Sequence, residues 1–401
     1  MRIIINECKK ILDIRIILLL CMFSILYYMT FTQIYRYPTG GQLTNTKYDI
    51  PFTAELVKEW GPKWKVKDEK QYQEKHQELE RGFAKIIKQD QELSKRGIVD
   101  YEIFNKKYEE LGQKTTLSKQ EKELGKLLEN YVFYNDKTSK IFLDIQALEH
   151  IREFQGSEYG VSDKKYKELK ADGFFDGTKL YQKAIEKRVK RDYISLVHEG
   201  VFYILQEDMV TIGGLIMICF FALIIPYQLK QRLRQVIPIL ATTKTGRRIY
   251  QIQLIASALA ALFVGILQMT VYGIIWHLKG LSVFWRCESW GIASNSYWCD
   301  KLSFGTYMLL YMALILLFAI ASIVIIDFIG RTIGNYMGAV AVSIPVCGVM
   351  MFLMRKIYYM LFLITNDQVL AYWELYALAT WLIVMLLFYK IRSKRWKKVD
   401  L

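Results

Sequence analysis

The residues best suited to a functional role lie in one basic stretch, 227–250, between two uncharged apolar runs. The stretch contains no Asp or Glu, and cations beside a membrane span mark its cytoplasmic side. An apolar knot at 236–240 separates two basic groups, although a solvated loop needs no such knot. We interpret 228–250 as a loop whose short helix docks on a cytoplasmic partner. Its six cations are Lys230, Arg232, Arg234, Lys244, Arg247 and Arg248.

No other stretch offers the chemistry of an enzyme. The sequence has no G-x-x-x-x-G-K-[ST], no G-x-S-x-G and no H-E-x-x-H, and its Cys and His spacing suggests no metal site. The glycines Gly330 and Gly334 belong to a connection between spans, because no strand precedes them and no Lys follows. We therefore expect no catalytic residues, metal or cofactor in this chain. An intramembrane enzyme would need polar residues that the spans lack.

The basic stretch is positioned by apolar runs long enough to cross a membrane. Each helical residue rises about 1.5 Å, so about 20 apolar residues span a bilayer. The middles of these runs carry no ionisable residues, which disfavours an ion-driven transporter and a channel with a charged filter. Six runs are predicted as spans, near 15–35, 209–227, 251–276, 303–326, 335–354 and 374–390.

The net charge of +15 is a topology signal and not a sign of nucleic-acid binding. Region 36–208 has nearly equal numbers of basic and acidic residues. The excess lies in the first fifteen residues, in 229–250 and in 390–398. Six spans place all three on one side, so we predict that both termini are cytoplasmic.

The predicted fold is an all-α integral membrane protein of three parts. Residues 1–35 hold an interfacial N-terminal helix and the first span, and a signal-peptide start is the alternative. Residues 36–208 form an α-helical extracytoplasmic domain between the first two spans, and 209–401 hold spans two to six. Within the last part, 355–373 is too short to span and is expected to be an outer re-entrant or interfacial helix.

Local patterns add detail to this fold. Ser118 and Glu121 form a predicted capping box, which opens a helix with an apolar stripe beginning at Leu124. Asp327 and Arg331 stand one helical turn apart and can pair. Cys287 and Cys299 share an outward loop, where they could form a disulfide or remain free thiols.

The chain resembles the permease subunits of type-2 ABC exporters. Members have an interfacial N-terminal helix, six spans, a coupling helix between spans two and three, and outer re-entrant helices before span six. A Leu-x-Thr-Thr-x-x-Gly-Arg pattern before the third span carries the likeness, together with KKILDIR near the start and 302–307 at the fourth span. Region 36–208 is outside it. The pattern residues are Leu240, Thr242, Thr243, Gly246 and Arg247.

One difference from the family stands at the start of the loop. Members frequently carry a Glu soon after the second span, at a point where an ion pair to the ATPase is expected. Here Gln228 and Lys230 occupy that neighbourhood and no acid is present.

The resemblance implies a role for each residue of the basic stretch. The apolar knot and the two threonines would sit in a cleft of an ATPase subunit, which would bind ATP and Mg. Gly246 would permit the turn into the third span, and Arg247 and Arg248 would anchor at phosphates or carboxylates. Alternatively, these residues only set the topology. The knot and threonine residues concerned are Ile237, Ile239, Leu240, Thr242 and Thr243.

Two functions from different classes are compatible with the sequence. The leading hypothesis is a permease subunit of an ATP-driven exporter in a bacterial cell membrane, working with an ATPase, a second permease copy or paralogue, and membrane lipid. It would export a peptide, lipid or drug-like substrate, and its large outward insertion suggests antimicrobial-peptide export or self-protection. The alternative is a membrane-anchored receptor or scaffold whose outward domain binds an envelope component or peptide.

Overall fold

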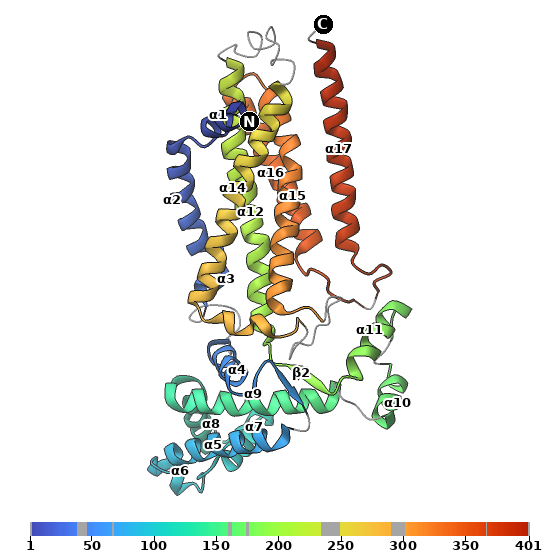
Figure 1. Ribbon diagram of the computed structural model, residues 1–401. Helices are drawn as coiled ribbons and strands as arrows, with labels where there is room; N and C mark the ends of the chain where they lie inside the picture. Colours follow the sequence, from blue (N-terminus) through green and yellow to red (C-terminus); the bar gives the residue numbers. More distant parts are fainter. Residues whose placement is uncertain are drawn as a thin grey trace.

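Six helices long and apolar enough to cross a membrane form the bundle in Figure 1, which confirms the six predicted spans by length and composition. The computed structural model describes residues 2–37, 46–65, 68–158, 163–173, 176–233, 249–289, 301–365 and 367–399. The six helices are α2 (Ile14–Phe31), α12 (Glu199–Leu233), α14 (Ile249–Leu278), α15 (Phe304–Thr332), α16 (Tyr336–Tyr358) and α17 (Trp373–Val399).

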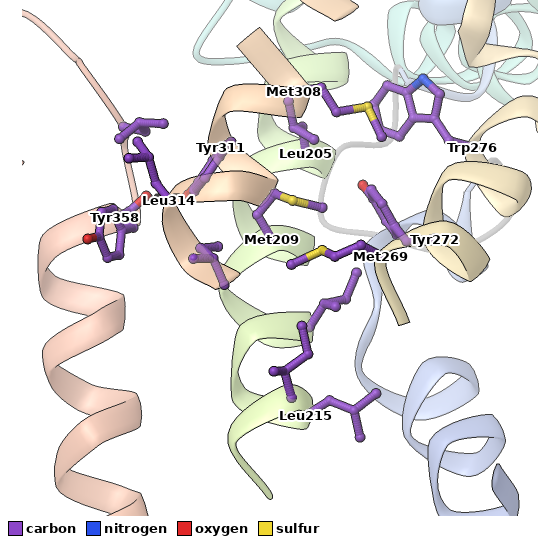
Figure 2. Close-up of a cluster of buried hydrophobic side chains, with 14 of the residues drawn as sticks. Leu205, Met209, Leu215, Met269, Tyr272, Trp276, Met308, Tyr311, Leu314 and Tyr358 are labelled. Atoms are coloured by element: carbon purple, nitrogen blue, oxygen red, sulfur yellow. Dashed lines mark hydrogen bonds between the residues drawn. The ribbon is translucent and has the colours of Figure 1, made fainter. Parts of the chain in front are cut away.

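Helix α12 is the central element of the bundle. Its most apolar window is 78% buried, against 17% for α2 and for α17, because α14, α15 and α16 all pack around it. A helix that is apolar on every side belongs in a core. Figure 2 shows Leu205 and Met209 of α12 facing Tyr272 of α14 and Tyr311 of α15. The helix is longer than the predicted 209–227, and it continues through Pro226.

The helix ends follow capping chemistry. Ser303 caps α15, accepting a hydrogen bond from the Thr306 amide at 3.2 Å, and Asn335 caps α16. Only residues 333–335 separate these two helices, so they form the tight hairpin that the sequence predicts.

Helix α1 (Arg2–Ile11) lies against α14 at the end of the bundle that also carries the C-terminus (Figure 1). A turn containing Asp13, whose side chain accepts from the Arg15 amide, separates it from α2. The inward side of α1 includes Glu7, which is only 5% exposed. The last turn of α12 and the first turn of α14 lie at the same end (Figure 1).

A second group of helices lies at the opposite end of the bundle, between α2 and α12 in the sequence (Figure 1). Its own apolar core includes Phe83, Phe104, Leu128 and Phe142. The Ser118 capping box is confirmed. The group contains α4 (Thr46–Trp60), α5 (Glu69–Ile87), α6 (Gln91–Lys95), α7 (Tyr101–Gln113), α8 (Lys119–Glu129), η2 (Asn130–Tyr134), α9 (Asp136–Glu158), α10 (Asp163–Ala171) and α11 (Lys179–Val189).

Two short strands, not predicted from the sequence, connect this group to the bundle. Strand β1 (Lys63–Lys65) pairs antiparallel with β2 (Tyr193–Ser195), which brings Trp64 opposite Ile194. Strand β2 leads directly into α12. The pair therefore ties the start of the helical group to its end, and both to the central helix.

Residues 359–372 connect α16 to α17 at the same end as the helical group. Where the structure describes this connection it consists of turns, not the expected re-entrant or interfacial helix. Phe362 and Tyr372 have φ angles of 63° and 54°, a left-handed conformation that interrupts a helix. The two rings contact each other with centroids 5.2 Å apart.

Candidate functional site

The predicted coupling residues lie outside the described residues, but the chain on both sides of them is described. Helix α12 ends at Leu233 and α14 begins at Ile249. The candidate site is therefore built from these two flanks and from what they contact. The residues outside the description are Ile237, Ile239, Leu240, Thr242, Thr243, Gly246, Arg247 and Arg248.

A buried ion pair on α15 lies between the two flanks. The Arg331 Nε donates to Asp327 Oδ2 at 2.8 Å, and the side chains are only 2% and 1% exposed. This confirms the pair that the one-turn spacing predicts. A charge at this depth requires a partner, because removing it from water is costly.

We call 234–248 the coupling segment, after its predicted role. Both of its flanks bond to this pair. On α12, Gln228 Nε2 donates to Asp327 Oδ1 at 2.5 Å. On α14, Gln253 Oε1 accepts from Arg331 Nη2 at 2.9 Å. Arg232 of α12 also donates to the Arg331 carbonyl at 3.1 Å. Side chains from three helices thus meet at one ionic centre, which we call the polar cluster (Gln228, Gln253, Asp327 and Arg331).

Aromatic and basic side chains extend the polar cluster to α1 and α17. Tyr227 of α12 donates its hydroxyl to Glu7 of α1. The Arg331 guanidinium lies 4.9 Å from the Tyr250 ring centroid, and Tyr250 stacks on Tyr389 of α17. Arg392 of α17 donates to the Thr332 hydroxyl at 3.0 Å. Five helices are therefore linked around the flanks of the coupling segment.

Close packing holds α12 and α15 together at this level. A Cβ added at Gly330 would lie 2.8 Å from the Gln228 Cβ. Only glycine permits this approach without a shift. Gly330 is therefore a close-contact position inside α15, and not part of the connection between spans in which the sequence analysis placed it. Buried polar capacity also remains, because Gln228 Oε1 and Gln253 Nε2 have no hydrogen-bond partner among the described residues.

The polar cluster supplies positioning and not bond chemistry. It contains no nucleophile beside a base, and the described residues include no group of three or more His, Cys, Asp and Glu able to hold a metal. What it can do is transmit displacement, because each flank is bonded to the same pair. The sequence showed that pair, but not its contacts with Gln228 and Gln253.

A second buried carboxylate, missed by the sequence reasoning, lies at the other end of α12. Because the helix starts at Glu199, Asp208 is inside it and fully buried. Its carboxylate accepts the Gln33 and Ile34 amides, the latter at 2.9 Å, at the start of α3 (Gln33–Arg36). The side chain therefore caps a short helix that follows α2 and fixes it to α12.

The helical group contains a polar cleft of about 620 Å³ between α5 and α9. His76 contacts two glutamates in it, Glu149 at 3.0 Å and Glu80 at 3.5 Å, while Tyr72 stacks on its ring. The Tyr101 hydroxyl donates to Glu149, and burial raises the pKa of Tyr101. The spacing of His76 and Glu80 on one helix is visible in the sequence, but the contact with Glu149 is not.

The loop after α14 is described only in part. Cys287 follows η4 (Leu281–Arg286), its thiol donates to the Leu196 carbonyl at 3.5 Å, and burial raises its pKa to about 12. Cys299 lies outside the described residues, so the disulfide stays a prediction.

An apolar groove of about 490 Å³ runs between α12 and α16, lined by side chains such as Phe221, Val340 and Met351. Part of the central helix α12 is accessible in this groove. Its apolar lining suits contact with lipid or with another apolar surface.

Comparisons with protein-family models, curated proteins and solved structures gave no match to this chain.

Proposed function

We propose that this chain is the membrane permease subunit of an ATP-driven exporter of the type-2 ABC class. The observation that carries the proposal is the convergence of both flanks of segment 234–248 on the Asp327–Arg331 pair. A loop that served only to connect two spans would not need its flanks bonded to a common buried charge. A segment that receives force does, because the force must pass to the bundle.

The polar cluster provides a route for that force. Displacement of the end of α12 moves Gln228 and Arg232, and both are bonded to α15. Displacement of the start of α14 moves Gln253, which is bonded to Arg331. An unpaired buried charge is strongly destabilising, so α15 is expected to move with its partners and not to separate from them.

The partners follow from the same proposal. An ATPase subunit binds ATP and Mg and docks on the coupling segment, and a second copy or paralogue completes the permease. The substrate is a peptide, lipid or drug-like molecule, exported outward from a bacterial cell. The distribution of charge supports cytoplasmic termini, because α1, the C-terminus and the end of α12 share one end of the bundle (Figure 1), and the last turn of α12 carries Lys230 and Arg232.

The test is coupled ATPase activity. The permease is purified with the ABC ATPase encoded beside it and reconstituted, and hydrolysis is measured with and without the permease. Replacing both Ile239 and Leu240 by Asp is expected to abolish the permease-dependent part of the ATP hydrolysis rate, because charged side chains do not enter an apolar cleft. Tyr134→Asp, an exposed aromatic in the helical group, is the matched control.

Two results would contradict this proposal. One is an intact permease that neither binds the ATPase nor changes its rate. The other is full coupling in the Ile239→Asp, Leu240→Asp double variant, which would remove the segment from the path of force.

The polar cleft in the helical group favours a second candidate, a receptor or scaffold that binds an envelope component or peptide there. Its paired carboxylates, Glu80 and Glu149, suit a basic ligand. A receptor would keep its ligand binding when the coupling segment is altered and would lose it in Glu149→Gln. In an exporter, altering the coupling segment would impair transport and leave ligand binding to the cleft unchanged.

A further inference from the structure

A second cavity, of about 620 Å³, lies at the end of the bundle that carries the helical group. It opens between the last turn of α16, the turns of 359–372 and the first turn of α17. This volume is typical of sites for small ligands. Its lining combines two cations, Arg355 and Lys356, one carboxyl group, Glu374, and aromatic side chains that include Tyr359 and Trp373.

The carboxyl group of Glu374 is only half satisfied. The residue is 1% exposed, and its Oε1 accepts the Phe362 amide at 2.9 Å. Its Oε2 is buried and has no hydrogen-bond partner among the described residues. A buried acceptor without a donor costs free energy, whereas a charged donor bound there would recover it. This oxygen is therefore suited to accept a hydrogen bond from a ligand that carries N–H groups.

The charges around the cavity leave one cation and one anion for a ligand. Arg355 lies 3.5 Å from Glu207, which also accepts the Tyr359 hydroxyl at 2.6 Å. Lys356 has no carboxylate within 4.0 Å in the part of the chain that the structure describes, and its ammonium lies 5.7 Å from the Phe352 ring centroid. A ligand that carries one negative and one positive group complements Lys356 and Glu374 together.

The rest of the lining is suited to a lipid. Phe352, Met360 and Trp373 are exposed large apolar side chains on the rim of the cavity. Tyrosine and tryptophan are enriched where a membrane meets water, and charged head groups lie at that depth. A cavity with charged groups beside an apolar rim can hold a charged head group while the acyl chains lie along the rim.

We infer that this cavity binds a phosphate ester that carries a primary ammonium, as in the head group of phosphatidylethanolamine. The ammonium donates to Glu374 Oε2, the phosphate accepts from Lys356, and the chains lie along Phe352 and Met360. The site does not depend on the proposed exporter function, because it needs neither the ATPase nor the coupling segment.

The test is binding of defined lipids to the full-length protein in detergent, measured by native mass spectrometry. Phosphatidylethanolamine is expected to bind at least about tenfold more tightly than phosphatidylcholine, because the quaternary ammonium has no N–H to donate. Glu374→Gln keeps an acceptor for Phe362 and is expected to abolish this preference. Lys356→Gln, an exposed change, is expected to weaken both lipids. Glu199→Gln and Lys301→Gln are matched exposed controls.

The other possible results of these binding measurements either overturn or support the proposed site. Equal binding of the two lipids, or an unchanged preference in Glu374→Gln, would overturn the site. Free phosphoethanolamine serves to identify the source. Binding as tight as that of the lipid would support the head-group chemistry but assign it to a soluble ligand. If the unaltered protein neither binds the ATPase nor changes its rate but keeps the lipid preference, the exporter is contradicted and this site still stands.

Discussion

The two ends of the central helix each meet a fully buried carboxylate, and the two are satisfied in different ways. Asp327, beside the coupling segment, is bonded by the side chains of Gln228 and Arg331. Asp208, beside the helical group, is bonded by the backbone amides of Gln33 and Ile34. Both residues are 0% exposed as a whole. Burial is therefore equal, and only the kind of partner differs.

This difference indicates which end can rearrange. Side chains have alternative rotamers, so the partners of Asp327 can follow a helix that moves. The amides that bond Asp208 belong to a helical turn and move only with their backbone. The end beside the coupling segment is suited to transmitting displacement, and the end beside the helical group is suited to anchoring it.

The largest expected effect comes from removing Asp327. Asp327→Ala leaves Arg331 buried without its carboxylate, and breaking such a pair costs about 3–5 kcal/mol of unfolding free energy. The measurement is the unfolding transition of the detergent-solubilised protein, followed by circular dichroism. Hydrogen exchange of the backbone amides around Gln228 should increase in the same variant.

The paired replacement tests the cause of that loss. Asp327→Ala with Arg331→Met removes both charges, so most of the stability is expected to return, because a buried pair replaced by apolar groups is often neutral. A double variant as unstable as the single one would show that the pair does not hold this end together.

Removing Asp208 is expected to have a smaller and more local effect. Asp208→Ala leaves the buried Ile34 amide and the partly buried Gln33 amide without their acceptor. A buried donor left unsatisfied costs about 1–3 kcal/mol, and the Gln33 amide is only partly buried, so a loss of about 1–3 kcal/mol is expected. Hydrogen exchange should increase at Gln33 and Ile34 and stay unchanged at the polar cluster. Asp208→Asn retains one acceptor and should lose less. Increased hydrogen exchange at the polar cluster as well as at Gln33 and Ile34 would contradict the proposed difference between the two ends of α12.

Gly330 tests how tightly α12 and α15 must approach at the polar cluster. Gly330→Ala places a methyl group 2.8 Å from the Gln228 Cβ, whereas Gly334→Ala meets nothing within 4 Å. Overpacking costs about 1–3 kcal/mol, so only the first variant should unfold more easily. Equal stability of the two variants would mean that the helices separate there without cost.

The elements that the sequence predicted are those fixed by local spacing. Apolar run length gave the six spans, and the one-turn spacing of Asp327 and Arg331 gave their pair. The partners of that pair could not be predicted, because Gln228 and Gln253 reach it only through the rotation and offset of three packed helices. Asp208 is likewise 174 positions from Ile34 in the chain.

The errors have the same origin. An apolar pattern favours a helix over 355–373, but Glu374 accepts the Phe362 amide and holds the chain in turns. The burial of Asp208 was also missed, because charged side chains usually lie in solvent. The neighbouring helices and α3 instead bury Asp208 within a longer helix.

The smallest effect concerns pH and separates the two ends once more. His198 lies between β2 and α12, and its Nδ1 accepts the Gly200 amide at 2.9 Å. Burial, assisted by the charge of His150, lowers the pKa of His198 from 6.5 to about 4. A histidine kept neutral contributes stability above pH 6.5, and this contribution is lost as the pH falls from 6.5 toward 4.

Acidification from pH 7 to pH 5 should therefore loosen the start of α12 and spare the polar cluster. Hydrogen exchange, corrected for its intrinsic pH dependence, should increase around Gly200 and not around Gln228. His198→Asn retains an acceptor for Gly200 but does not titrate, so its exchange at Gly200 should be independent of pH over this range. A pH response that persists in His198→Asn would assign the effect to another group.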